Sequence, residues 1–156
     1  MRYNMRVFLC PYDGFSLAVP MDTVLSVTLH RKKTEKTIEY NYENFNTYIS
    51  LPLLFNCALS DAGHGIILKD GIDEQLENKI ILLTYKIENE TELSVNKIYP
   101  VPKALAVMKF SHFFKGIVFS HRYQREKKAC DIPAEDLILL LNHENIVQNI
   151  KKEFEV

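Results

Sequence analysis

Short apolar segments alternate with polar, turn-forming segments along most of the chain. From Val7 to Val27 the order is an apolar segment, a polar turn, a returning segment ending in Leu-x-Val, and a third apolar segment. A similar order runs from Ile80 to Val101. Alternation of this kind predicts β-strands, so each stretch is expected to form a three-stranded meander. Because a meander cannot bury both of its faces alone, the two must curl up or pack together.

Other segments extend this all-β pattern. Pro52, next to Leu51, favours a single helical turn, whereas the stretch from Ser60 to Gly65 has the composition of a turn. An amphipathic pattern after Asn142 predicts a C-terminal helix. The total of about ten short strands with regular turn signals is typical of small barrels. The further strands are expected at residues 38–42, 48–51, 65–69, 115–120 and 137–141.

Composition limits the classes of function. The 156 residues suffice for one domain, or for two very small units that share a core. Nineteen basic and 20 acidic residues give a net charge of −1, which provides no overall attraction to nucleic acid or an anionic membrane. Three cysteines, odd in number and far apart, argue against a disulfide framework. No apolar run approaches the ~18 residues of a membrane span, and a cytoplasmic protein is expected.

Candidate catalytic groups are isolated from one another in the sequence. His64 lies in a glycine-flanked segment, and Cys57 follows an apolar turn, with no neighbour that would lower its pKa. The histidines and cysteines show no zinc-ligand spacing, and the five glycines form no phosphate-binding loop. The expectation is therefore a protein that is not an enzyme and has no metal site and no cofactor.

Two basic segments support an alternative function, a small β-barrel module that binds nucleic acid. They span residues 30–36 and 122–128, and the tyrosines near position 40 could supply stacking platforms for bases. Both segments also contain glutamate, and arginine is scarce. Solvated loops are the simpler interpretation of these runs.

The order of segments resembles the CheW-like domain, the coupling module of bacterial chemotaxis arrays. The resemblance covers nearly the whole chain, and the C-terminal segment is the closest match. The chain departs from the family's pattern in two places. The family's Arg-Gly segment should fall at Ile38–Tyr42, where neither arginine nor glycine occurs. Ser50 stands where the family has an aspartate. The segments that carry the resemblance are FSLAVPMDTVLSV (15–27), YISLPLLFNC (48–57), IILLTY with ELSVNKIYPV (80–101), FFKG (113–116) and LILLLNHENIV (137–147).

The resemblance implies a fold and a function. The fold would be a single all-β domain over residues 1–156, with two intertwined SH3-like five-stranded β-barrels and a C-terminal α-helix. One sub-barrel would comprise about 1–71 plus 137–156, and the other about 76–121. The function would be that of a non-catalytic adaptor coupling the cytoplasmic tip of a chemoreceptor to the regulatory domain of a histidine kinase. Partner-binding residues would be Val24, Val27, Tyr40, Tyr42, Tyr48, Val95, Asn96 and Gly116.

Overall fold

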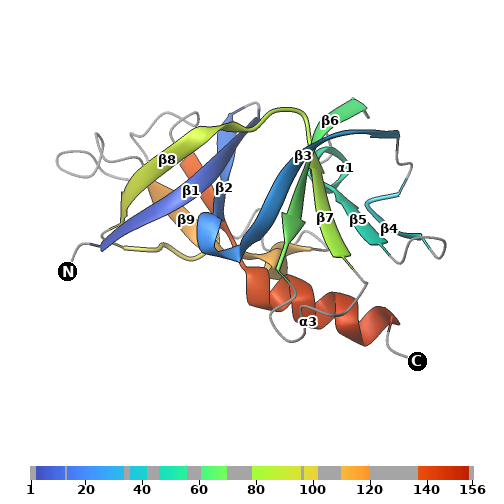
Figure 1. Cartoon of the computed structure of the whole chain (residues 1–156). Coiled ribbons are helices and arrows are strands. Elements are labelled where there is room, and N and C mark those ends of the chain that lie inside the picture. Colours follow the sequence, from blue (N-terminus) through green and yellow to red (C-terminus); the bar gives the residue numbers. More distant parts are fainter. Residues whose placement is uncertain are drawn as a thin grey trace. The chain divides into compact units, whose positions relative to one another are not determined.

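The computed structural model describes residues 3–12, 14–33, 36–41, 46–55, 61–69, 79–95, 97–101, 110–119 and 137–154. Within this part of the chain the strands form two five-stranded sheets, which confirms the all-β fold class (Figure 1). No helix among the described residues is long and apolar enough to cross a membrane. The chain divides into two compact units, residues 1–22 with 88–142 and residues 23–87 with 143–156.

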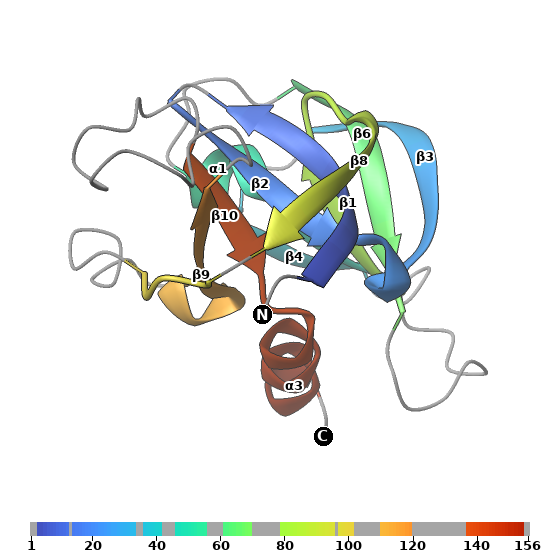
Figure 2. The ribbon, with the colours of Figure 1, turned by 90° about the vertical axis from the view of Figure 1, so that its left-hand side faces the viewer.

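The first unit contains the sheet with strand order β8-β1-β2-β10-β9. Strands β1 and β2 form an antiparallel hairpin, and Gly14 turns the chain with a positive φ of 85°. Strand β10 lies between β2, to which it is parallel, and β9, to which it is antiparallel (Figure 2). The strands are β1 (Tyr3–Tyr12), β2 (Phe15–Pro20), β8 (Glu88–Val95), β9 (Phe114–Phe119) and β10 (Leu137–Leu141).

The central position of β10 explains its composition. Four of its five residues, Ile138 to Leu141, are buried, as expected for a strand with neighbours on both sides. The expectation from sequence that this leucine-rich run is a buried strand is confirmed. The core cluster around it consists of Val7, Ala18, Leu93, Val95, Val118, Ile138 and Leu140.

The second unit contains the sheet with strand order β3-β6-β7-β5-β4. Its parallel pair is β5 with β7, and the other neighbouring strands run antiparallel. Tyr48, Ile81 and Leu83 form a core cluster in this unit. The strands are β3 (Val24–Lys33), β4 (Ile38–Asn41), β5 (Asn46–Ser50), β6 (Asp61–Leu68) and β7 (Lys79–Thr84).

The two α-helices in the described part of the chain occur where the sequence predicts them. In α1 (Leu51–Leu54) the Leu53 N–H donates to the Ser50 hydroxyl over 3.4 Å, so Ser50 caps a turn that begins with proline. Helix α3 (His143–Phe154) buries Ile146, Val147 and Ile150 on one face. Two 3-10 turns, η1 (Met21–Thr23) and η2 (Ser111–Phe113), precede β3 and β9.

The strand pairing differs from the two expected meanders. Strand β3 joins a different sheet from β1 and β2, and the consecutive strands β7 and β8 also belong to different sheets. The two compact units have other bounds than the expected sub-barrels, which stay a prediction, and β1 pairs with β8, about 80 residues further along the chain. Residues 61–65, interpreted as a turn, are part of β6 instead. Local alternation indicates a strand but does not identify its partner.

Candidate functional site

Strand β3 is one edge of the second unit's sheet. It is ten residues long and, among the described strands, pairs only with β6. An edge strand presents backbone N–H and C=O groups on its outer side, so it offers a template to which another chain can add a strand. The antiparallel ladder with β6 is interrupted by register shifts between Val24 and Ser26 and between Leu29 and Lys32. These bulges leave a regular stretch from Ser26 to Leu29.

Three apolar side chains on β3 face solvent. The exposed fractions are 58% for Leu25, 39% for Val27 and 82% for Leu29. Val27 and Leu29 stand two residues apart and lie on one face of the strand, whereas Leu25 is the extra residue of the bulge between Val24 and Ser26. We call these residues the β3 stripe. Together with Tyr99 they are the exposed large apolar residues in the described part of the chain.

Strand β6 fixes the position of the stripe. Val27 pairs with Ile66, which is fully buried, and Leu29 pairs with His64. Cross-strand partners lie on the same face of a sheet, so Val27 and Leu29 continue an apolar face whose inner part is core. A mixed apolar and partly exposed face of this kind is suited to contact with another protein.

Tyr40, a second expected contact residue, lies at the opposite end of the same strand order. It belongs to β4, pairs with Thr47 and is half-buried. Three strands, β6, β7 and β5, separate β4 from β3 in the sheet. The structure therefore does not bring Tyr40 and Val27 together on neighbouring strands. They mark two separate edges.

Several expected contact residues belong to the core instead. Tyr48 is 4% exposed and Val95 is 1% exposed, so neither side chain is available to a partner. The Tyr48 hydroxyl lies 3.4 Å from the Asn46 side-chain amide, which donates to it. Val24 is half-buried at the start of β3. Tyr42 and Asn96 lie outside the described residues.

Gly116, also expected at the contact surface, has a structural role. Tyr99 and Ile117 exchange two backbone hydrogen bonds of 2.9 and 2.8 Å beside it. A Cβ atom at Gly116 would lie 2.1 Å from the Tyr99 carbonyl oxygen, so only glycine allows this close approach. The bridge holds Tyr99 against the outer edge of β9, and the Lys97 ammonium stands 4.9 Å from the Tyr99 ring centroid.

Sequence reasoning did not single out Leu25 and Leu29, the two most exposed members of the stripe. The available signal was the alternation of apolar and polar residues from Val24 onward. That alternation predicts one apolar face, which is buried in most strands. Only the pairing shows that β3 is an edge whose apolar face lies partly in solvent.

The described residues assemble no catalytic or metal-binding group. No cluster of three or more histidine, cysteine, aspartate or glutamate side chains is placed to hold a metal ion within that part of the chain. His64 lies on β6, opposite Leu29 and Thr84, rather than in an exposed turn. Cys10 is buried in β1, whereas Cys57 and the whole of the second basic segment lie outside the described residues.

Comparisons with known proteins identify the fold. No protein-family model matches the sequence, and the search of curated proteins finds no match. Among solved structures, the chain is similar to the scaffolding protein TtCheW from Thermoanaerobacter tengcongensis, with a TM-score of 0.55. The two are 15% identical, and the match covers 90% of each chain. The fold expected from sequence, that of a divergent CheW-like domain, is confirmed.

Proposed function

We propose that this chain is a non-catalytic adaptor of bacterial chemotaxis signalling that works in the cytoplasm. It would couple the cytoplasmic tip of a chemoreceptor to the regulatory domain of a histidine kinase through protein–protein contacts. The fold alone does not imply this function, because one fold serves many functions. The observation that carries the proposal is the β3 stripe, an apolar surface on an edge strand of this scaffold.

A coupling protein needs two separate contact surfaces. The β3 stripe and the β4 edge with Tyr40 lie at opposite ends of one strand order. We assign the β3 stripe to the kinase regulatory domain, because its three exposed aliphatic side chains suit the apolar centre of an interface. We assign the β4 edge to the receptor tip, where Tyr40 supplies an aromatic anchor.

Each assignment serves as the control for the other. Binding of the purified chain to the regulatory domain and to a receptor-tip fragment is measured by calorimetry. Val27→Asp is expected to abolish kinase binding and leave receptor binding unchanged, and Tyr40→Ala is expected to do the reverse. Val27 is 39% exposed and Tyr40 is half-buried, so circular dichroism melting curves first establish that both variants fold. If wild-type chain binds neither partner, the adaptor proposal is wrong.

Ionic strength separates the adaptor from the nucleic-acid alternative. An interface centred on aliphatic side chains loses little affinity as salt rises, because apolar burial is not screened. Binding through Lys32, Lys33 and Lys36 to phosphates would weaken steeply with salt. Steep salt dependence together with normal binding by Val27→Asp would favour the nucleic-acid module instead.

A further inference from the structure

His64 adjoins the β3 stripe. It lies on β6 directly opposite Leu29, in the last pair before the register shift in β3. Leu29 is 82% exposed and His64 is half-buried. Residues paired in this way lie on one face of the sheet, with their Cβ atoms about 4.5–5.5 Å apart. A partner that covers Leu29 therefore also covers His64.

The face of the sheet around His64 is mostly aliphatic. Val27 precedes Leu29 on the same face of β3 and pairs with Ile66, which is fully buried on β6. On the other side His64 pairs with Thr84 of β7, a neutral residue that is fully buried. An imidazolium ion covered by such groups loses its water and gains little in return, so a complex of this kind favours the neutral imidazole.

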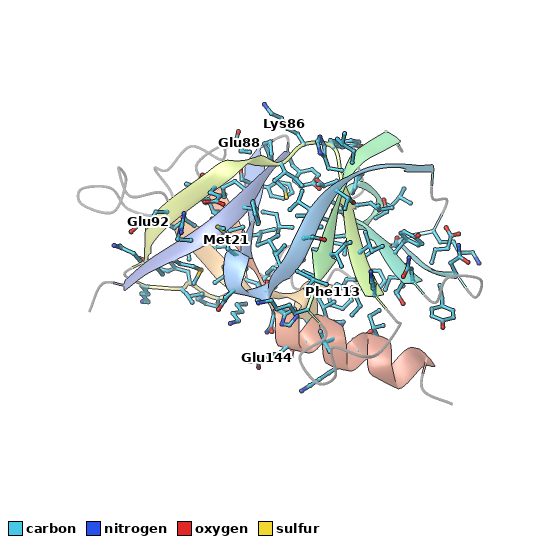
Figure 3. The ribbon with its side chains drawn as sticks, viewed as in Figure 1. Met21, Lys86, Glu88, Glu92, Phe113 and Glu144 are labelled. Atoms are coloured by element: carbon cyan, nitrogen blue, oxygen red, sulfur yellow. The ribbon has the colours of Figure 1, made fainter. Side chains whose placement is uncertain are left out.

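The charged positions near His64 offer no compensation for a positive charge. Along the two flanking strands the charged positions that follow are basic. Arg31 lies in the β3 bulge, and the exposed Lys86, labelled in Figure 3, lies two residues beyond Thr84. Position 61 of β6, an aspartate, belongs by alternation to the opposite face of the strand. The described part of this face therefore has no carboxylate to pair with a protonated imidazole.

We propose that His64 makes the contact with the kinase regulatory domain sensitive to protons: the domain binds when the His64 imidazole is neutral and is released when the imidazole is protonated. Histidine is the residue whose charge ordinarily changes between about pH 5 and pH 8. Because the complex favours the neutral form, affinity is full above the titration range of the imidazole and is lost as the pH falls through it. This role rests on the proposed function, because it needs the β3 stripe to be the surface that binds the kinase.

The other described histidines lack this position. His112 is exposed on η2, and its ring lies edge-on to the ring of Phe113 with 4.7 Å between the centroids. His143, at the start of α3, donates from Nε2 to the backbone carbonyl of Lys69. Neither belongs to a strand that pairs with β3. Of the histidines that the structure describes, only His64 has a stripe residue as its neighbour in the sheet.

Calorimetry of kinase binding at several pH values tests this role of His64. Wild-type chain should lose about tenfold in affinity between about pH 7.5 and pH 5.5, because one excluded proton lowers affinity by at most tenfold per pH unit. Binding near the middle of this range should release a proton, which is measured by repeating the titration in two buffers of different ionisation enthalpy. His64→Gln keeps a neutral polar side chain and should bind with little dependence on pH. His112→Gln is the matched control and should behave as wild type.

Failure of the adaptor function and failure of the proton switch give different results. If wild-type chain binds no kinase regulatory domain at any pH, the adaptor function is wrong and the role of His64 falls with it. If the chain binds, but wild type and a folded His64→Gln variant share one pH profile, only the role of His64 is overturned. Affinity that rises as the pH falls would overturn it as well.

Nuclear magnetic resonance of wild-type chain provides a measurement that needs no variant. At about pH 5.5 the His64 imidazole signals, assigned through the backbone, should move from the protonated to the neutral position when the kinase regulatory domain binds. Signals that stay at the protonated position in the complex would contradict the proton switch.

Discussion

Leu29→Thr removes the most exposed apolar side chain of the β3 stripe while keeping a residue that suits a strand. Leu29 is 82% exposed, so its contribution to the core is small, and the free energy of unfolding should change by no more than about 0.5 kcal/mol. Fully burying a leucine contributes about 1.5–3 kcal/mol. Scaled by the exposed 82%, a partner that covers Leu29 gains about 1.2–2.5 kcal/mol from it.

That gain sets the expected loss of affinity. Binding of the kinase regulatory domain should weaken by up to about 7- to 60-fold in Leu29→Thr. Calorimetry measures this loss of affinity, with Ser26→Thr on the same strand as control. Unchanged kinase affinity in a folded Leu29→Thr variant would refute the assignment of the stripe.

Three further predictions concern stability, each measured by thermal and urea unfolding. Gly116→Ala should lower the free energy of unfolding by about 2 kcal/mol or more, because its Cβ would lie 2.1 Å from a backbone carbonyl oxygen. Gly63→Ala is the control. Its Cβ would meet its nearest atom at 3.9 Å, so the variant should be as stable as wild type or slightly more stable. Equal effects of the two would contradict the close-approach argument. Leu140→Ala should lower the free energy of unfolding by about 2–5 kcal/mol, because Leu140 is fully buried in the central strand β10. A loss below about 1 kcal/mol would contradict the central position of β10. Glu90→Gln removes the 2.7 Å ion pair between Arg6 and Glu90. The free energy of unfolding should fall by no more than about 1 kcal/mol, because the two side chains are 67% and 51% exposed. A larger loss would show that the pair matters to folding.

Features determined by neighbouring residues could be predicted from the sequence. The leucine-rich run of β10, the amphipathic repeat of α3 and the Leu51-Pro52 start of α1 each carry a local signal, and each forms the expected element. In all three cases the period or the cap depends on residues within a few positions of one another. The all-β class follows from the same local signals.

Strand partners could not be predicted in this way. The meander interpretation grouped β7 with β8 because they are consecutive, yet β8 pairs with β1 and β7 pairs with β5 and β6. Each pairing depends on which apolar faces meet across the fold, and that is a property of distant residues. The stretch containing His64 is a second case in which local sequence did not determine the structure. Its glycines suggested a turn, but pairing with β3 and β7 holds it in a strand.

The contact surface was harder to predict than the fold, because it is defined by exposure rather than by residue type. Catalytic and metal sites have characteristic residues at characteristic spacings, whereas the β3 stripe consists of leucine and valine, the residues that also fill cores. Val27 and Val95 both lie in strands with apolar alternation, yet one is 39% exposed and the other 1% exposed. Both β3 and β8 end their sheets, so strand order does not account for the difference. Val95 packs in the core cluster with Val7 and Ile138, whereas Val27 stays partly in solvent. For a protein that acts through contacts, the informative observation is therefore an apolar residue that the fold leaves in solvent, and only the packed structure reveals it.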